Sequence, residues 1–340
     1  MTARGRGYLL AVGSALLVGC STPGVGPTSL QPSATTITGS SSGFPVGSSV
    51  IRGLKQPFGL ATAKGAAWVT EYEAGNLVRI DTSANRITAR IHVGPHASHV
   101  VIQAGFAWVV DDLGGALIAV DTRTNRVSKN IPMRPTSELR PIGLAADAGS
   151  LWVILASNTE YQANPRNPPS QLVRVDPAGD EVLDTISLPG NVAGVATGGG
   201  AVWVVSNLEP ITIYRIDPTT KRVAARIDTG HTASGALVYQ EPYLWVANQD
   251  GYLTRIDART NGVTLFEVGS PEWPALVAEG NAIWISAPLD NLVARFDPAT
   301  GSISRTVRTG GSRPQEFAFL GNDIWVANYI DGTVAKLPIN

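Results

Sequence analysis

Cysteine, methionine, histidine and charged residues are all scarce in this sequence. Its 340 residues include one cysteine, two methionines and four histidines, and only 16% are charged, against roughly a quarter in ordinary soluble domains. A single cysteine excludes an internal disulfide framework and any zinc or iron–sulfur site built from cysteines. The 26 basic and 27 acidic residues nearly balance, which excludes the basic footprint of a nucleic-acid binder. The sequence also contains no zincin motif.

Glycine and proline, in contrast, are abundant, with 36 and 23 copies. Both residues favour turns and interrupt helices. Together with 44% hydrophobic residues, this composition indicates a globular, turn-rich β protein and not a bundle of long helices.

The first 19 residues have the layout of a secretory signal. Arg4 and Arg6 precede an apolar run, residues 8–18, that is too short to span a bilayer. The run ends in Leu-Val-Gly-Cys at residues 17–20, which resembles the lipobox of bacterial lipoproteins. That resemblance implies removal of residues 1–19, lipidation of Cys20 with palmitate-type chains and an extracytoplasmic location on a membrane. In a bacterium with two membranes, Ser21 resembles the pattern exported to the outer membrane.

Residues 20–46 read as the lipidated cysteine and a flexible tether. The segment 21–46 has no charged residue, and 19 of its 26 residues are Ser, Thr, Pro or Gly, so it lacks the apolar surface that would order it. A random coil of this length reaches about 28 Å. That distance holds a domain clear of lipid head groups.

Seven tryptophans recur through the rest of the chain at intervals of 39 to 51 residues. They are Trp68, Trp108, Trp152, Trp203, Trp245, Trp284 and Trp325. Each begins a short β-rich cluster such as Trp-Val-Ala-Asn, and an apolar-Asp turn follows about 13 residues later in six copies. Four short strands per period of roughly 42 residues predict the blade of a β-propeller. We therefore expect residues 47–340 to form one all-β, seven-bladed propeller with four-stranded blades.

The last repeat ends after its third strand, whereas residues 49–53 resemble a fourth strand without a blade. We expect this N-terminal strand to complete the seventh blade and close the ring. Closure removes an exposed sheet edge that would invite association, so we also expect a monomer.

The repeated Trp-Val-Ala-Asn and Ile-Asp-Pro motifs resemble those of seven-bladed propellers with YVTN-type repeats and of the related streptogramin (virginiamycin B) lyase-like proteins. The resemblance covers residues 47–340. The resemblance implies a propeller fold. Proteins with this repeat include an enzyme as well as binding proteins, so the activity of this chain stays open.

Candidate site residues gather where the innermost strands begin, at the mouth of the central channel. The position nine residues before each repeat tryptophan is Gly or Ala in five blades, but His99 and Glu316 in the other two. We expect these two side chains, with the neighbouring Gln315 and His96, to face one another there, and His231 to reach the same mouth. The histidines are candidates for a base or metal ligand, with Glu316 as partner; solvated or backbone-bonded histidines are the alternative.

Further candidates lie in loops expected on the same face. Glu71, Asp111 and Asp112 follow the repeat tryptophans and can hold Mg²⁺ or Ca²⁺ through oxygen ligands, or can serve turn and capping roles with water. An insertion in the third repeat carries Tyr161 and Arg166, and Trp273 precedes the sixth innermost strand. These three are candidate contacts to a ligand or partner, while the insertion is equally a tolerated surface loop.

Two function hypotheses follow. The first is a lipid-anchored propeller that binds a partner protein or envelope ligand through its loop face, without chemistry. The second, implied by the resemblance, is a carbon–oxygen lyase or hydrolase that opens a cyclic ester by proton abstraction with His and Glu residues and a divalent cation. The absence of a sharp catalytic motif favours the first.

Overall fold

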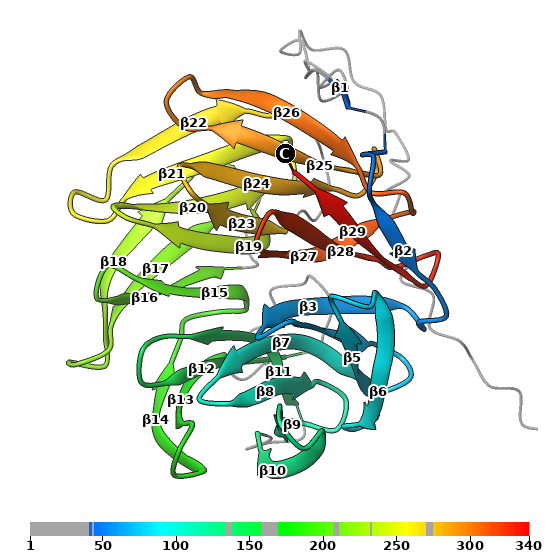
Figure 1. Cartoon of the computed structure of the whole chain (residues 1–340). Coiled ribbons are helices and arrows are strands. Elements are labelled where there is room, and N and C mark those ends of the chain that lie inside the picture. Colours follow the sequence, from blue (N-terminus) through cyan, green and yellow to red (C-terminus); the bar gives the residue numbers. More distant parts are fainter. Residues whose placement is uncertain are drawn as a thin grey trace, which may run out of the picture. The chain divides into compact units, whose positions relative to one another are not determined.

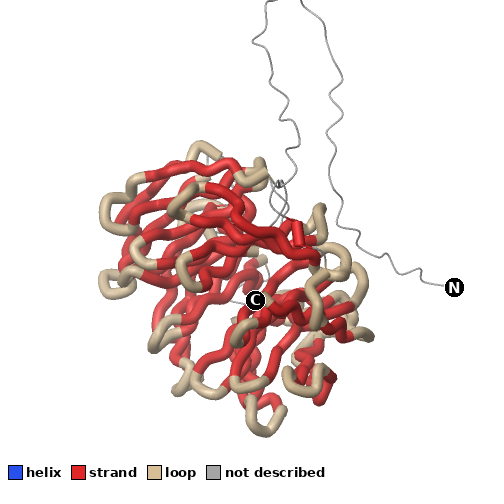
Figure 2. Tube along the Cα trace, turned by 45° about the horizontal axis from the view of Figure 1, so that its top comes forward, coloured by secondary structure: helices blue, strands red, loops and turns tan. Residues whose placement is uncertain are grey.

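The computed structural model describes residues 41–42, 44–133, 138–157, 169–206, 211–231, 233–269 and 275–339. All of them belong to one compact unit, Ala34–Asn340. Their secondary structure is entirely strand and turn (Figure 2). The predicted signal segment and Cys20 lie outside the described residues.

Seven antiparallel sheets form the blades of a propeller, as predicted (Figure 1). From the innermost strand outward, blades 1 to 3 comprise β3 (Pro57–Ala63), β4 (Ala66–Glu71), β5 (Asn76–Asp81) and β6 (Arg86–His92); β7 (Ala97–Gln103), β8 (Phe106–Asp111), β9 (Ala116–Asp121) and β10 (Arg126–Pro132); and β11 (Leu139–Ala146), β12 (Leu151–Ser157), β13 (Gln171–Asp176) and β14 (Glu181–Ser187). Blades 4 and 5 comprise β15 (Val192–Gly198), β16 (Ala201–Ser206), β17 (Thr212–Asp217) and β18 (Arg222–Asp228); and β19 (Ala233–Gln240), β20 (Tyr243–Asn248), β21 (Tyr252–Asp257) and β22 (Val263–Glu267). Blade 6 comprises β23 (Leu276–Glu279), β24 (Ala282–Ala287), β25 (Leu292–Asp297) and β26 (Ser302–Arg308), and blade 7 comprises β27 (Pro314–Leu320), β28 (Asp323–Asn328), β29 (Thr333–Pro338) and β2 (Ser49–Ile51).

The innermost strands contact one another in a closed cycle from β3 through β7, β11, β15, β19 and β23 to β27 and back to β3. The N-terminal β2 pairs with β29, with Ser49 opposite Lys336 and Ile51 opposite Val334. It is therefore the outermost strand of the seventh blade, the place expected from the sequence. Just before it, β1 (Ser41–Ser42) pairs in parallel with β26 of blade 6. The end of the segment expected to be a tether thus adds a short fifth strand to that blade.

Each repeat tryptophan packs its own blade against the next. Trp68 of blade 1 is buried with Val100 and Val109 of blade 2, and Trp325 of blade 7 is buried with Leu60 of blade 1. Similar layers lie at the other blade junctions. A blade cannot cover both faces of its own sheet, so the core consists of these layers and exists only in the assembled ring.

The aspartate of the apolar-Asp turn shapes the hairpin between the third and fourth strands. Asp81 Oδ1 accepts hydrogen bonds from the amides of Ser83 and Ala84. Asn85 then adopts the left-handed conformation, with φ 50°, which asparagine tolerates better than most residues. The five other turn aspartates accept the same kind of bond: Asp121, Asp176, Asp217, Asp257 and Asp297. These residues are structural.

Candidate functional site

The innermost strands begin, and the second strands end, on one side of the ring, which we call the loop face. His99 lies in β7 of blade 2 and Glu316 lies in β27 of blade 7. His99 Nδ1 is 2.7 Å from Glu316 Oε1. The two side chains meet across blade 1, whose Leu60 amide donates to Glu316 Oε2 at 3.0 Å. The structure therefore brings together the two residues that interrupt the run of small side chains near the axis.

The surroundings of His99 favour its charged form. Burial opposes protonation, but the charge of Glu316 and its hydrogen bond favour it, and so do Asp112 and a backbone hydrogen bond with Ile142. Together these raise the pKa of His99 above its ordinary value. The imidazole ring is held by Glu316 on one side and by the backbone of blade 3 on another.

A second histidine–carboxylate pair lies beside the first. His96 Nδ1 is 3.2 Å from Asp112 Oδ1, and the hydroxyl of Tyr72 donates to Asp112 Oδ2 at 3.0 Å. The rings of Tyr72 and His96 stack with centroids 4.8 Å apart. Burial, reinforced by the charge and hydrogen bond of Asp112, raises the pKa of Tyr72 well above its usual range. The hydroxyl thus stays protonated and keeps donating to Asp112.

Phe58 links the two pairs. Its ring centroid lies 5.5 Å from those of Tyr72 and His99 and 6.4 Å from that of Tyr329. His96, Tyr72, Phe58, His99 and Tyr329 therefore form a continuous set of half-buried rings from blades 2, 1 and 7, which we call the aromatic band.

Sequence reasoning missed the three apolar or phenolic members of this band. A signal for two of them was present, because Tyr72 and Tyr329 are both the fourth residue after a repeat tryptophan, the position that Asp112 occupies in blade 2. Phe58 directly precedes Gly59 of the near-axis position. The position of Phe58 follows no pattern from blade to blade, so its large side chain did not stand out in the sequence.

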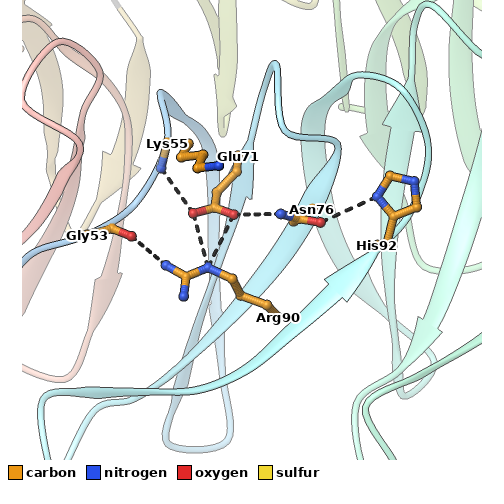
Figure 3. A network of polar contacts seen from close by, with 6 residues as sticks. All are labelled: Gly53, Lys55, Glu71, Asn76, Arg90 and His92. Atoms are coloured by element: carbon orange, nitrogen blue, oxygen red, sulfur yellow. Dashed lines mark hydrogen bonds and ion pairs between the residues drawn. The ribbon is translucent and has the colours of Figure 1, made fainter.

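Glu71 is buried, with 1% of its surface exposed, which favours the turn and capping role over a contact to a ligand on the loop face. Its carboxylate accepts hydrogen bonds from the Lys55 amide at 3.0 Å, from Asn76 Nδ2 at 2.8 Å and from Arg90 Nε at 3.3 Å (Figure 3). Arg90 in turn donates to the Gly53 carbonyl. This network ties β5 and β6 to the segment that follows β2, which is a structural task.

Asp111 is also buried, with 4% exposed. Its Oδ1 accepts from the amides of Gly114 at 2.8 Å and His96 at 3.2 Å. A Cβ at Gly114 or Gly94 would lie within 2 Å of Asp111 Oδ2 because the loops close tightly around this carboxylate. Asp111 therefore shapes the loop that presents His96.

The structure places the third predicted histidine elsewhere on the loop face. His231 Nδ1 pairs with Asp250 Oδ2 at 2.6 Å, and its ring stacks on Tyr252 at 4.6 Å. All three belong to blade 5, and among the described contacts none joins His231 to Glu316. Gln315 is half-buried beside Glu316 in β27.

Other candidates fall outside the described residues. These are the lipidation site Cys20, the insertion residues Tyr161 and Arg166, and Trp273. Among the described residues, no three His, Cys, Asp or Glu side chains lie close enough together to hold a metal ion. No helix in the described part of the chain has the length and apolar character needed to cross a membrane.

We find no match of the sequence to a protein-family model or to a curated protein. Solved structures match the fold. A streptogramin B lyase superposes with a TM-score of 0.71 at 17% identity, covering 86% of this chain and 97% of the lyase. A catalytically inactive virginiamycin B lyase from Staphylococcus aureus with quinupristin gives 0.70 at 20% identity, with 86% and 99% coverage.

A hydrazine synthase from Kuenenia stuttgartiensis has the same architecture, with a TM-score of 0.69 at 14% identity and 84% and 96% coverage. Enzymes of unrelated chemistry thus share this ring. At these identities the similarity establishes the seven-bladed propeller fold and leaves the activity to be argued from the site.

Proposed function

We propose that this chain is a lipid-anchored, extracytoplasmic propeller that binds a partner protein or envelope ligand through its loop face. The aromatic band carries this proposal. Half-buried rings present large apolar area at low entropic cost, and such residues dominate binding energy where they cluster. Here the rings are fixed by one another and by two histidine–carboxylate pairs. Binding therefore loses little further side-chain entropy.

The state of His99 favours binding over catalysis. A general base must offer an unprotonated nitrogen to its substrate. The pKa of His99 is raised despite its burial, because Glu316 and the Ile142 backbone hold its charged form. Raising the pKa lowers the fraction of His99 that is unprotonated at any given pH and so favours a hydrogen-bond donor over a general base.

The anchor is proposed from the N-terminal sequence, with residues 1–19 as signal and Cys20 as the acylated residue. A Cys20→Ala variant is expected to lose incorporation of radiolabelled palmitate and to leave the membrane fraction. Ser21→Ala, which keeps the acylation site, is the matched control and should retain both. Retained labelling in Cys20→Ala would overturn the anchor.

Site-specific photocrosslinking in intact cells tests the binding function. Benzoylphenylalanine in place of Tyr329 samples the aromatic band, and the same residue in place of Val182, which is 47% exposed on β14, samples an outer strand. We expect a discrete adduct from the Tyr329 position alone. No adduct, or equal adducts from both positions, would count against a binding site on the loop face.

The alternative is a lyase, favoured by the fold shared with streptogramin B lyase and by the His99–Glu316 pair. It would break a carbon–oxygen bond of a cyclic ester after proton abstraction, with Mg²⁺ or Ca²⁺ as candidate cofactor. Mass spectrometry of a cyclic depsipeptide incubated with the protein, with Mg²⁺ or with EDTA, separates the two functions. Linearisation that is lost in His99→Ala would establish the lyase and overturn the pure binding function.

A further inference from the structure

The aromatic band joins five rings from three neighbouring blades. It passes from His96 and Tyr72 through Phe58 to His99 and Tyr329, with neighbouring centroids 4.8 to 6.4 Å apart. Three blades contribute to it, and every ring is half-buried. Aromatic rings offer an apolar body with a polar tip. A ligand that covers the band must therefore have apolar faces repeated along its length.

Charged groups of both signs lie beside the band. Glu316 is paired with His99, and Asp112 lies 3.2 Å from a ring nitrogen of His96. The two tyrosines of the band also lie near both acidic and basic side chains. Burial and Asp112 raise the pKa of Tyr72 while Arg140 lowers it, and for Tyr329, after burial, Glu73 raises the pKa while Arg313 lowers it.

A ligand with one strong charge would meet repulsion from half of these groups. A phosphate is opposed by the carboxylates, and an organic cation by His99 and the arginines, so neither sign gains from the whole site. Closely spaced donors and acceptors suit hydroxyl groups, because each hydroxyl both donates and accepts a hydrogen bond.

Resting on the proposed binding function, we infer that the loop face binds a neutral oligosaccharide. Sugar rings have apolar C–H faces that pack on aromatic rings, and their hydroxyls fit the fixed donors and acceptors of the two pairs. A chain of several sugars matches the extent of the band from blade 2 to blade 7. This assigns a chemical class to the envelope ligand.

Blade 5 supplies a matched control. Tyr252 stacks on His231 at 4.6 Å, and His231 pairs with Asp250, so the same three residue types recur as in Tyr72, His96 and Asp112. Among the described contacts, this second trio has no ring partner in the aromatic band. Loss of Tyr252 removes an equivalent stacking pair and leaves the proposed saccharide surface intact.

The test uses the detergent-solubilised full chain on an array of neutral hexose, pentose and N-acetylhexosamine oligomers, followed by calorimetric titration of the strongest. Choline and inorganic phosphate are the charged probes. We expect a pentasaccharide to bind at least tenfold more tightly than its monosaccharide. Tyr72→Ala should raise its Kd about threefold to tenfold, the value of one aromatic packing contact, and Tyr252→Ala should leave it unchanged.

Melting temperatures of the two variants identify any loss that comes from misfolding. Tyr72→Phe provides a second variant, which keeps the ring and should retain most of the affinity. Absence of binding to every neutral oligomer, tighter binding of choline or phosphate, or equal losses in Tyr72→Ala and Tyr252→Ala would overturn the inference. If Tyr329 crosslinks a ligand in cells while the neutral oligomers fail, the saccharide class is wrong and the binding function stands. If the crosslink also fails, both are wrong.

Discussion

His99 and Glu316 are 217 residues apart in the chain, and their side chains meet at 2.7 Å. The contact joins blade 2 to blade 7 and passes over blade 1, whose Leu60 amide binds the second oxygen of Glu316 at 3.0 Å. Three consecutive blades are thereby fixed around one carboxylate. The geometry of the loop face in this sector depends on the pair, and so do several measurable properties.

The first prediction concerns the titration of His99. Burial lowers the pKa of His99, and the charge of Glu316 is the largest influence that raises it. Glu316→Gln removes that charge and leaves the burial unchanged. The pKa of His99 should then fall towards its ordinary value or below it, because only Asp112 and the Ile142 backbone would still raise it. NMR titration of the imidazole signals measures this, with the His231 signals as internal control. An unchanged His99 curve would show that Glu316 does not govern the charge.

The second prediction concerns stability against pH. A histidine whose folded pKa is raised contributes stability that is complete below its unfolded value of about 6.5 and is lost as pH rises through the folded value. The difference in melting temperature between wild type and Glu316→Gln should therefore be larger at pH 6 than at pH 9. Gln315→Ala, which leaves the pair intact, should show no such trend. A melting-temperature difference that grows with pH would contradict a raised pKa of His99 in the folded state.

The sequence predicted the ring because repeated features report repeated structure. The seven tryptophans recur because every blade needs the same core, and the six turn aspartates recur because blades 1 to 6 share the same hairpin between their third and fourth strands. Irregular features carry the site instead. His99 and Glu316 were found because they break a repeat, whereas Phe58 escaped notice because no repeat position defined what was expected there.

The third prediction uses two glycines that share the near-axis position but differ in surroundings. A Cβ on Gly194 would lie 1.8 Å from the Gly235 carbonyl oxygen of the next blade, whereas a Cβ on Gly143 meets nothing closer than 3.5 Å. Neither has a left-handed φ. Gly194→Ala should therefore lower the free energy of unfolding by about 1–3 kcal/mol through overpacking, and Gly143→Ala should change it far less. Denaturant unfolding of both variants checks this, and equal losses would contradict the close approach of blades 4 and 5 at Gly194.

Glu71 illustrates what sequence could not supply. The pattern Trp-Val-Thr-Glu placed it at the end of a strand on the loop face, which is correct, but burial depends on the segment 52–55 passing over it. That segment reaches its position through the pairing of β2 with β29, a contact between opposite ends of the chain. Exposure of a side chain is thus decided by tertiary packing that no local pattern contains.

The fourth prediction follows from that burial. Glu71→Ala removes the acceptor for Asn76, Arg90 and the Lys55 amide, and unpaired buried donors cost about 1–3 kcal/mol. Thermal or denaturant unfolding should show a loss of this order, and Glu71→Gln, which keeps one oxygen acceptor, should lose less. The effect should be the same with Mg²⁺ and with EDTA because the carboxylate oxygens are occupied by protein donors. A loss that appears only with Mg²⁺ would instead make Glu71 a metal ligand.

The last prediction concerns the strand that completes blade 7. Ile51 of β2 is 7% exposed, and so is Ile131 of β10, the corresponding isoleucine in the outermost strand of blade 2. If β2 is an integral part of the ring, truncation of either side chain removes the same apolar contacts. Ile51→Ala and Ile131→Ala should each lower the free energy of unfolding by about 2–4 kcal/mol, measured by denaturant unfolding of the full chain. A loss confined to Ile131→Ala would show that the N-terminal strand does not contribute to the stability of the ring. Limited proteolysis would then cleave near residue 51 before the ring unfolds.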